Sequence, residues 1–212
     1  AHAQIVRHRI GQHRRQIVGG GKGQGLGGAQ HGHGSPGAFA HRYIVLYACE
    51  MNTLTVIAAD YHHPPHARAV VDLLDAYARD PAGGGHPLSE HARSNLPREL
   101  ALRPQAFSVL AFDGEQPVGL VNCIEGFSTF ACRPLVNVHD VVVLASHRGQ
   151  RVGERMLAEV ERMARDRGAC KVTLEVLSGN TPAWRLYQRI GFAGYQLDPA
   201  LGSAQFLQKW LD

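Results

Sequence analysis

The segment VVVLASHRGQRVG, residues 141–153, joins an apolar run to a short polar turn and then to an amphipathic helix. The run favours a buried strand, and Val152, Met156 and Val160 follow the turn at helical spacing. The first N–H groups of a helix have no partner within the helix, and the helix dipole adds positive potential there. Glycines let the backbone approach a ligand closely. The segment therefore predicts an anion-binding turn at a helix N-terminus.

A second motif lies one predicted helix and one predicted strand downstream of this turn. Residues 180–192, NTPAWRLYQRIGF, offer Asn180 or Thr181 as a helix cap and Pro182 at the first helical position. The segment has the pattern N-x-x-A-x-x-L-Y-x-x-x-G-F, and its apolar residues share one side of the helix. The segment therefore predicts a short amphipathic helix that ends at Gly191.

Together the two motifs resemble the GNAT superfamily of acyl-CoA-dependent N-acyltransferases. The family pattern in the turn is Arg/Gln-x-x-Gly-x-Gly/Ala after a strand. Arg148 and Gly153 match this pattern, and Arg151 stands where the first glycine is usual. The second motif resembles the second acyl-CoA segment of the family. The resemblance covers roughly residues 53–211. It implies an α/β fold with a mixed sheet and the order β-αα-β-β-β-α-β-α-β-β.

Local patterns predict most of these elements from the residues themselves. Apolar runs that alternate or continue favour strands, and apolar residues three and four positions apart favour helices. Pro64 and Pro65 punctuate the chain before the first helix, and Pro97 is expected to kink or split the second. We expect strands at 53–58, 106–112, 117–125, 135–143, 171–177, 195–197 and 204–210, helices around 69–77, 89–102, 152–167 and 181–190, and a loop at 126–134.

The charge of the chain is unevenly distributed. The net charge is +4, but residues 1–50 carry six Lys or Arg and one acidic residue, whereas residues 51–212 have a net charge of −1. Residues 1–50 are rich in Gly, His and Arg, which predicts a low-complexity extension without a packed core. Residues 51–212 have the composition of one globular domain. We hypothesise that Met51 is the native start. The basic residues lie in the extension, so they do not indicate nucleic-acid binding by the domain.

Other features of the composition exclude several classes of protein. The four cysteines, Cys49, Cys123, Cys132 and Cys170, show neither a CxxC pattern nor metal-ligand spacing. They predict free thiols in a reducing cytoplasm and no metal site. No apolar run reaches the roughly 18 residues that a membrane span requires, so no membrane partner is expected.

The resemblance implies that acetyl-CoA is a co-substrate. In this family the pantetheine arm pairs with the strand before the turn, and the pyrophosphate lies on N–H groups of the turn and of the following helix. The cofactor-binding residues expected from the resemblance are Val141, Val142, Val143, Arg148, Gly149, Gln150, Arg151, Val152, Gly153, Asn180 and Tyr187.

The resemblance also implies direct transfer from the thioester to an amine. Tyr187 is placed to protonate the departing thiolate, and a backbone N–H near Val143 is placed to stabilise the developing oxyanion. The attacking amine must lose a proton, and His139, Asp140 and Glu125 are the candidate acceptors. Neighbouring side chains on a strand face opposite ways, so His139 and Asp140 are not both expected to face the acceptor unless a bulge intervenes.

The acceptor side is expected between the two early helices and the loop after the third strand. This expectation points to Asp72, Tyr77, 83–85, Asn122 and 127–130. The acceptor is expected to be a primary amine of a small molecule or a peptide. No acidic cluster of the kind that binds a polycation is present, which does not favour a polyamine. The alternatives are a non-catalytic acyl-CoA-binding regulatory module and a nucleic-acid-binding protein built on residues 1–50. The oligomeric state stays open, with a homodimer among the alternatives.

Overall fold

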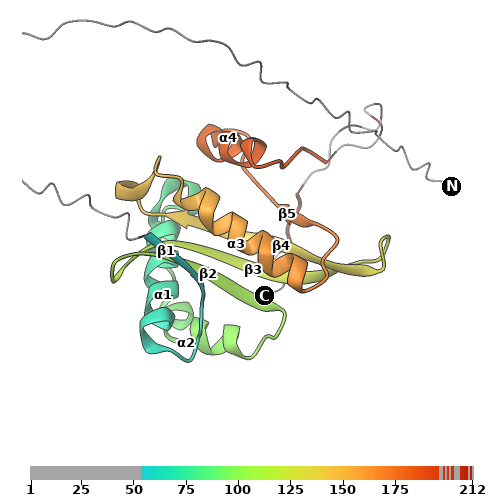
Figure 1. Cartoon of the computed structure of the whole chain (residues 1–212). Helices are drawn as coiled ribbons and strands as arrows, with labels where there is room; N and C mark the ends of the chain where they lie inside the picture. Colours follow the sequence, from blue (N-terminus) through green and yellow to red (C-terminus); the bar gives the residue numbers. More distant parts are fainter. Residues whose placement is uncertain are drawn as a thin grey trace, which may run out of the picture. The chain divides into compact units, whose positions relative to one another are not determined.

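The computed structural model of the chain describes residues 54–195, 198, 200, 202, 206–209 and 211. Five strands form one sheet in the order β1-β2-β3-β4-β5, in which β1 to β4 are antiparallel and β5 runs parallel to β4 (Figure 1). The strands are β1 (Leu54–Ala58), β2 (Ala106–Asp113), β3 (Gln116–Ser128), β4 (Arg133–Val143) and β5 (Val172–Leu174). The helices are α1 (Pro64–Arg79), α2 (Glu90–Ala101), α3 (Val152–Asp166) and α4 (Thr181–Arg189), with 3-10 turns η1 (Pro81–Gly83) and η2 (Ala145–His147).

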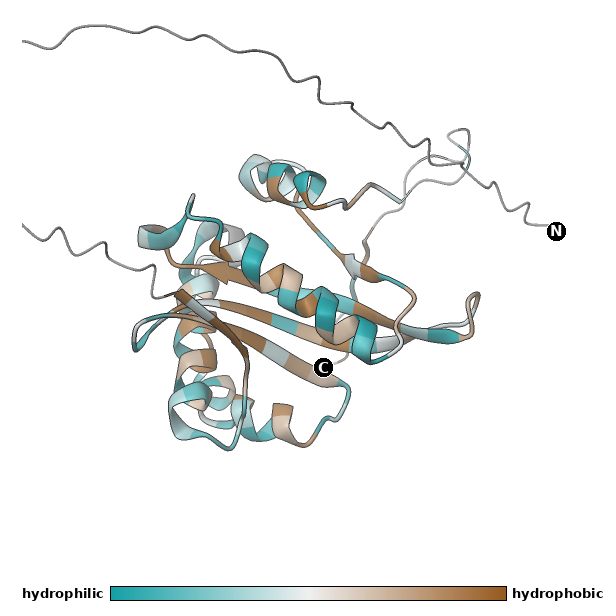
Figure 2. Cartoon of the chain, viewed as in Figure 1, coloured by the Kyte–Doolittle hydropathy of each residue, from teal (hydrophilic) through white to brown (hydrophobic). Residues whose placement is uncertain are grey.

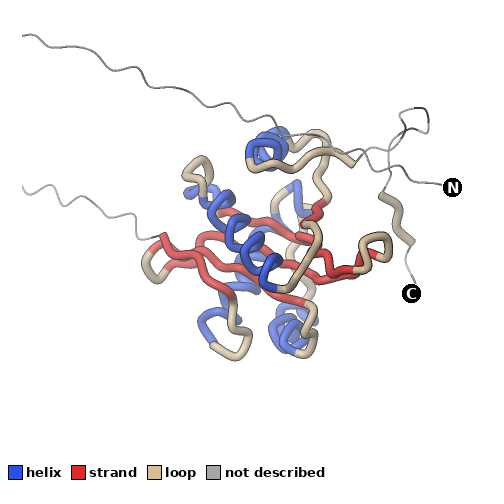
Figure 3. Tube along the Cα trace, turned by 45° about the vertical axis from the view of Figure 1, so that its right-hand side comes forward, coloured by secondary structure: helices blue, strands red, loops and turns tan. Residues whose placement is uncertain are grey.

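Helices cover both faces of this sheet, and each face has its own apolar core. On one face, α3 and the buried side of α4 pack against the strands through residues such as Met156, Leu157 and Tyr187. On the other face, α1 contributes Val70 and Leu73, and α2 lies beside it (Figure 3). Figure 2 shows hydrophobic residues along the central strands and hydrophilic residues on the outer side of α3. The mixed α/β architecture predicted from the sequence is therefore confirmed.

Capping explains where several helices begin and end. The Ser89 hydroxyl accepts a hydrogen bond from the N–H of Ala92 at 3.1 Å and begins α2. The Asn180 side chain accepts from the N–H of Ala183 at 3.3 Å and begins α4, so Asn180 rather than Thr181 is the cap. Gly168 follows α3 with φ of +70°, the left-handed conformation that glycine adopts at low cost. These three helices agree within one residue at each end with the expected ranges 89–102, 152–167 and 181–190.

The prolines behave differently from the prediction. Pro64 and Pro65 do not precede the first helix but form its first turn, where a missing N–H has no helical partner to lose. The first helix therefore begins before the apolar spacing becomes visible. Pro97 lies inside α2, which runs without a break from Glu90 to Ala101. None of the α2 residues is buried, so the carbonyl that Pro97 leaves without its usual donor is close to solvent.

Two strand boundaries also differ from the prediction. The expected loop at 126–134 is mostly strand, because β3 continues to Ser128, β4 begins at Arg133, and the extra residues pair with one another. The expected strand 171–177 is paired only over Val172–Leu174, because its pairing with β4 ends at Val138, directly before an irregularity in β4. Of the expected hairpin at 195–197 and 204–210, residues 195 and 206–209 are not strand, and the others lie outside the described residues.

Residues 1–50 and Met51 also lie outside the described residues, so the domain boundary and the native start stay predictions. In the part of the chain that the structure describes, no helix has the length and apolar character to cross a membrane.

A β-bulge interrupts the pairing of β3 with β4. Cys123 opposes Val138 and Asn122 opposes Asp140, so His139 is an extra residue without an opposite partner. An extra residue reverses the alternation of side chains beyond it. Val138 faces the α3 side, and Asp140 is turned to the α1 side, to which Asn122 also belongs. The bulge therefore decides which face of the sheet receives the polar residues of β4.

Candidate active site

A cavity of about 380 Å³ lies between the two early helices and the centre of the sheet. Its walls are largely apolar, and its polar floor comes from β3 and β4. The lining residues are Leu74, Tyr77, Ala78, Gly83, Leu88, Leu96, Leu100, Asn122, Ile124, His139 and Asp140. Asp140 is the acidic residue of this lining. Apolar walls with a few convergent polar groups are typical of small-molecule sites.

Both polar residues of the bulge face this cavity. The extra residue, His139, is exposed, whereas Asp140 is half-buried. The side-chain amide of Asn122 donates to Oδ2 of Asp140 at 3.0 Å. Consecutive residues of a regular strand would face opposite ways. The bulge removes this restriction and brings an imidazole and a carboxylate together at one cavity.

The third candidate base, Glu125, lies elsewhere. Its carboxylate accepts a hydrogen bond from the Arg167 guanidinium at 3.0 Å, and the same guanidinium lies 4.4 Å from the centre of the Phe107 ring. Phe107 and the end of α3 belong to the opposite face of the sheet from the cavity. Ile124, the residue before Glu125, lines the cavity instead. The structure therefore does not bring Glu125 together with His139 and Asp140.

Two tyrosines join the cavity to the core below α4. Tyr187 is only 7% exposed, and burial, followed by the nearby Tyr77, raises the pKa of Tyr187 to about 12. Tyr77 lines the cavity, and burial, followed by the charges of Asp140 and Asp80, raises the pKa of Tyr77. Both phenols therefore keep their protons at neutral pH. Tyr77 lies within electrostatic range of both Asp140 and Tyr187, so it links the two ends of the site.

The turn before α3 contains two residues in the left-handed backbone conformation. Gly149 has φ of +79°, and Arg151, the residue before α3, has φ of +60° and ψ of +17°. Arg151 thus adopts the left-handed conformation that the usual family glycine would adopt more easily. The side-chain amide of Gln150 donates a hydrogen bond to the backbone carbonyl of Ser146 at 3.1 Å and so closes the turn. The side chain of Arg151, the N-cap residue, makes no capping hydrogen bond to α3, which suits the first N–H groups of the helix to bind a ligand.

The other residues expected at the cofactor make structural contacts around this turn. Arg148 donates to the Val143 carbonyl at 3.1 Å and pairs with Asp80 at 3.2 Å. Gly153 is buried, and a Cβ at this position would lie 3.1 Å from Leu186, so the glycine lets α4 approach the start of α3. Asn180, in turn, fixes the first turn of α4.

The edge of β4 is open beside this turn. Over Val141–Val143, β4 pairs with β3, whereas β5 pairs with β4 only at Val136–Val138. Within the described residues, the other edge of Val141–Val143 therefore has no strand partner. An unpaired edge presents backbone N–H and C=O groups that an extended ligand can bind. The open edge, the α3 N-terminus and the cavity with Asp140 are successive parts of one segment of β4 and its turn.

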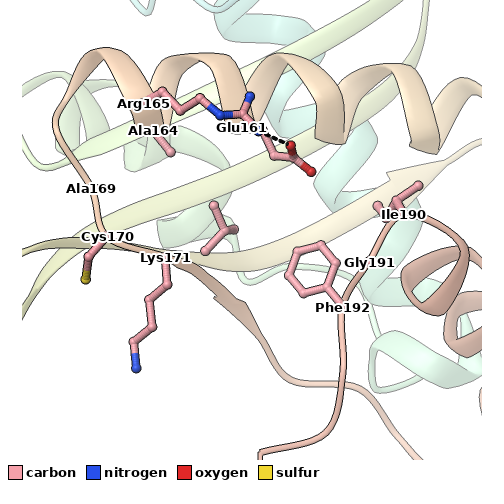
Figure 4. A pocket seen from close by; sticks show the side chains of 10 residues that line it. Glu161, Ala164, Arg165, Ala169, Cys170, Lys171, Ile190, Gly191 and Phe192 are labelled. Atoms are coloured by element: carbon pink, nitrogen blue, oxygen red, sulfur yellow. Dashed lines mark hydrogen bonds and ion pairs between the residues drawn. The ribbon is translucent and has the colours of Figure 1, made fainter. Parts of the chain in front are cut away.

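A second cavity, of about 280 Å³, lies along the C-terminal half of α3, the start of β5 and the end of α4. Figure 4 shows Phe192 and Lys171 at this cavity, with the Glu161–Arg165 ion pair above it. Its lining includes neither the α3 N-terminus nor the residues of the bulge. The polar groups suited to transfer chemistry are therefore at the first cavity.

The expected acceptor residues are only partly brought together. Tyr77, Asn122 and Gly83 line the cavity, but Asp72 is exposed on α1, and Phe127 and Phe130 are 59% and 103% exposed in the β3–β4 hairpin. The hairpin carries these aromatic residues away because β3 and β4 continue past the cavity.

Sequence reasoning also missed two residues of the site. Tyr61 and Ser108 are hydrogen-bonded to each other and, through Ser108, to Asn122. The sequence does contain one sign of such a role for Ser108, because it is the polar residue of the otherwise apolar strand segment AFSVLAF. The pairing register, which the sequence does not show, is needed to connect them.

Residues 67–192 match the model of the acetyltransferase (GNAT) family. This match spans more than half of the chain, which therefore belongs to the GNAT family, and the predicted family is confirmed. A streptothricin acetyltransferase from Streptomyces lavendulae is 36% identical over 87 residues, which cover 40% of this chain and 46% of the relative. The chain thus spans about half the length of the curated relative that it matches.

Solved structures show the same fold. An aminoglycoside acetyltransferase, meta-AAC0020, from an uncultured soil metagenomic sample in complex with sisomicin, superposes with a TM-score of 0.62 at 14% identity, over 76% of this chain and 98% of that chain. AAC(6')-Iy in complex with a bisubstrate analogue, CoA-S-monomethyl-acetylneamine, superposes with a TM-score of 0.58 at 18% identity, over 74% of this chain and 99% of that chain. Identities this low support the fold alone.

The left-handed conformation of Arg151 predicts opposite effects of two substitutions. Arg151→Gly removes the backbone strain of a residue with a Cβ, so we expect the free energy of unfolding to rise by at most about 1 kcal/mol. Arg151→Val places a β-branched residue at positive φ, and we expect a loss of about 2 kcal/mol. Urea denaturation measures both. The two variants remove the same charge, so equal stabilities would contradict the backbone explanation.

Proposed function

We propose that this chain transfers an acetyl group from acetyl-CoA to a primary amine of a small molecule or a peptide, by direct attack in a ternary complex. The observation that carries the proposal is the bulge of β4, which sets His139 and Asp140 at a cavity beside an open strand edge. The GNAT membership of the chain and the CoA analogue named for one structural neighbour support the choice of co-substrate.

The residues around the turn fit acetyl-CoA. The N–H groups at the start of α3 suit a pyrophosphate, because they are oriented outward and the helix dipole favours negative charge. The free edge of Val141–Val143 suits the amide groups of the pantetheine arm, which can pair as an added strand. Arg148 donates a hydrogen bond to the Val143 carbonyl, so it is suited to hold the backbone in place at this end of the edge. When bound, acetyl-CoA supplies a thioester whose carbonyl carbon accepts the amine nitrogen as the sulfur leaves.

Two residues of the cavity and the buried Tyr187 are suited to separate steps of binding and proton transfer. Asp140 is suited to bind the ammonium form of the acceptor, since its carboxylate is the acidic group of the lining. His139 then accepts a proton from the amine, directly or through a water. Tyr187 keeps its proton at neutral pH, because burial raises its pKa to about 12, and so it can donate that proton to the thiolate. A buried thiolate is also a stronger base than one in water, which reduces the mismatch between the two groups.

The lining of the cavity favours an acceptor whose amine is attached to an apolar framework. Leucines form most of the walls, and Asp140 is the acidic residue among them.

The relatives are named for streptothricin and for aminoglycosides, which makes these antibiotics the first small molecules to test. A panel should therefore contain simple alkylamines, sisomicin, streptothricin and short peptides.

The proposed function predicts release of CoA when acetyl-CoA and a suitable amine are present together. We expect at least one amine of the panel to release CoA, measured with a thiol reagent, from both the full chain and the chain lacking residues 1–50. A rise in melting temperature with acetyl-CoA, but no release with any amine, would favour the non-catalytic module instead. If millimolar acetyl-CoA caused no shift in melting temperature and no amine released CoA, both functions would be contradicted.

Loss of the Tyr187 hydroxyl should slow turnover without weakening CoA binding. We expect Tyr187→Phe to lower kcat by about 100-fold, the lower range of general acid catalysis, with little change in KM for acetyl-CoA. The exposed Tyr195 offers a control, because Tyr195→Phe removes the same kind of hydroxyl from a residue that is not buried in the core. Since the pKa of Tyr187 is raised to about 12, its titration should not limit kcat at neutral or mildly alkaline pH. Unchanged turnover in Tyr187→Phe would remove the acid role.

Removal of the His139 imidazole should change the pH dependence of the reaction. A base is inactive when protonated, so kcat/KM for the amine falls at acidic pH in the wild type. We expect His139→Ala to flatten this acidic limb and to lower kcat/KM at neutral pH by about 100-fold. His62→Ala is the control, since His62 is exposed outside the cavity. An unaltered acidic limb would assign the role of base to Asp140 or to water instead.

A further inference from the structure

A row of polar side chains crosses the sheet and ends at Asp140. Ser108 of β2 is directly opposite Asn122 of β3, and Asn122 is directly opposite Asp140 of β4. The hydroxyl of Ser108 is 2.6 Å from Oδ1 of Asn122, and Nδ2 of Asn122 is 3.0 Å from Oδ2 of Asp140. Tyr61, in the turn between β1 and α1, extends the row with its hydroxyl 2.8 Å from that of Ser108. The row therefore joins four elements of the fold.

The donors of this row all point towards Asp140. An ionised carboxylate only accepts hydrogen bonds, so Asn122 must direct its NH₂ group to Asp140 and its carbonyl oxygen to Ser108. The Ser108 hydroxyl therefore donates to Asn122, and its oxygen is left to accept from the Tyr61 hydroxyl. Burial raises the pKa of Tyr61, which keeps this phenol protonated and able to donate. Each member thus determines the orientation of the next.

The buried part of the row lies on β2 and β3. Ser108 is 1% exposed and Asn122 is 7% exposed, and the neighbouring residues on both strands are apolar. Buried polar groups add stability only when all their hydrogen bonds are made, and apolar residues at these positions would pack without this requirement. The row ends at a carboxylate that lines the cavity, so its orientation has a consequence for a ligand.

We propose that Tyr61, Ser108 and Asn122 are positioning residues that hold the Asp140 carboxylate for the acceptor amine. Asn122 occupies Oδ2 of Asp140 and leaves the other oxygen for an ammonium group in the cavity. A side-chain amide does not readily pass a proton along, so the row fixes geometry and does not relay protons. The proposal rests on the proposed function in one respect, namely that the cavity receives an amine.

Two isosteric variants of Ser108 test this role. Thr and Val have the same shape, so Ser108→Thr and Ser108→Val add equal bulk at a buried site, but only threonine keeps the hydroxyl. The probe is hexylammonium, with hexanol as its uncharged counterpart, and binding to the full chain is measured by calorimetry. We expect Ser108→Val to bind hexylammonium about 10-fold more weakly than Ser108→Thr, and we expect both to bind hexanol equally.

The outcomes separate this inference from the proposed function. Equal affinities of the two variants for hexylammonium, or no binding of hexylammonium to the wild type at millimolar concentration, would overturn the positioning role. A difference confined to hexylammonium would support it, even if no amine of the panel released CoA from acetyl-CoA. In the turnover assay the same difference should appear in KM for the amine and leave KM for acetyl-CoA unchanged. A merely structural role would lower the melting temperature without this selectivity.

A substitution at the far end of the row keeps the test open if the Ser108 variants do not fold. Tyr61 is half-buried, so Tyr61→Phe removes one hydroxyl without creating a cavity in the sheet. Because Tyr61 acts through two intermediates, we expect a smaller loss of hexylammonium affinity, about threefold, and no change for hexanol. Equal binding of hexylammonium by Tyr61→Phe and the wild type would exclude Tyr61 from the row.

Discussion

The site depends on one extra residue in β4. His139 has no opposite partner on β3, and the pairing resumes with Asp140 opposite Asn122. Without the extra residue, His139 would oppose Asn122, and Asp140 would be turned towards the α3 side of the sheet. The pairing of β5 with β4 ends at Val138, directly before the bulge, and the strand edge beyond it is open. One bulge therefore sets both the polar floor of the cavity and the edge beside it.

The two faces of the sheet hold different parts of the site. The α1 side contains the cavity, with Asp140 and Tyr77, whereas the α3 side contains the buried Tyr187. The charge of Asp140 contributes to the raised pKa of Tyr77, and Tyr77 contributes to the raised pKa of Tyr187, so each pair lies within electrostatic range. Direct transfer between an acceptor and a thioester needs such an arrangement, since both must reach one point.

Much of the fold could be predicted from local sequence. Ser89 and Asn180 cap helices, Gly168 ends one, and the apolar residues of α3 face the sheet, because each of these effects acts within a few residues of the chain. The prediction was wrong where pairing partners decide the outcome. Most of the expected loop at 126–134 is strand because β3 and β4 pair there, and the strand at 171–177 is shorter than expected because its pairing with β4 ends at Val138, directly before the bulge.

The sequence by itself determined the family, the position of the turn before α3 and the identities of Tyr187, His139 and Asp140 as candidate residues, because these depend on residue type and spacing along the chain. Only the tertiary structure decided that His139 and Asp140 share one face, that Glu125 is paired with Arg167 on the other face, and that Ser108 lies beside Asn122. The physical reason is strand register. A shift of one residue reverses every side chain beyond it, and register is set by contacts between segments that are distant in the sequence.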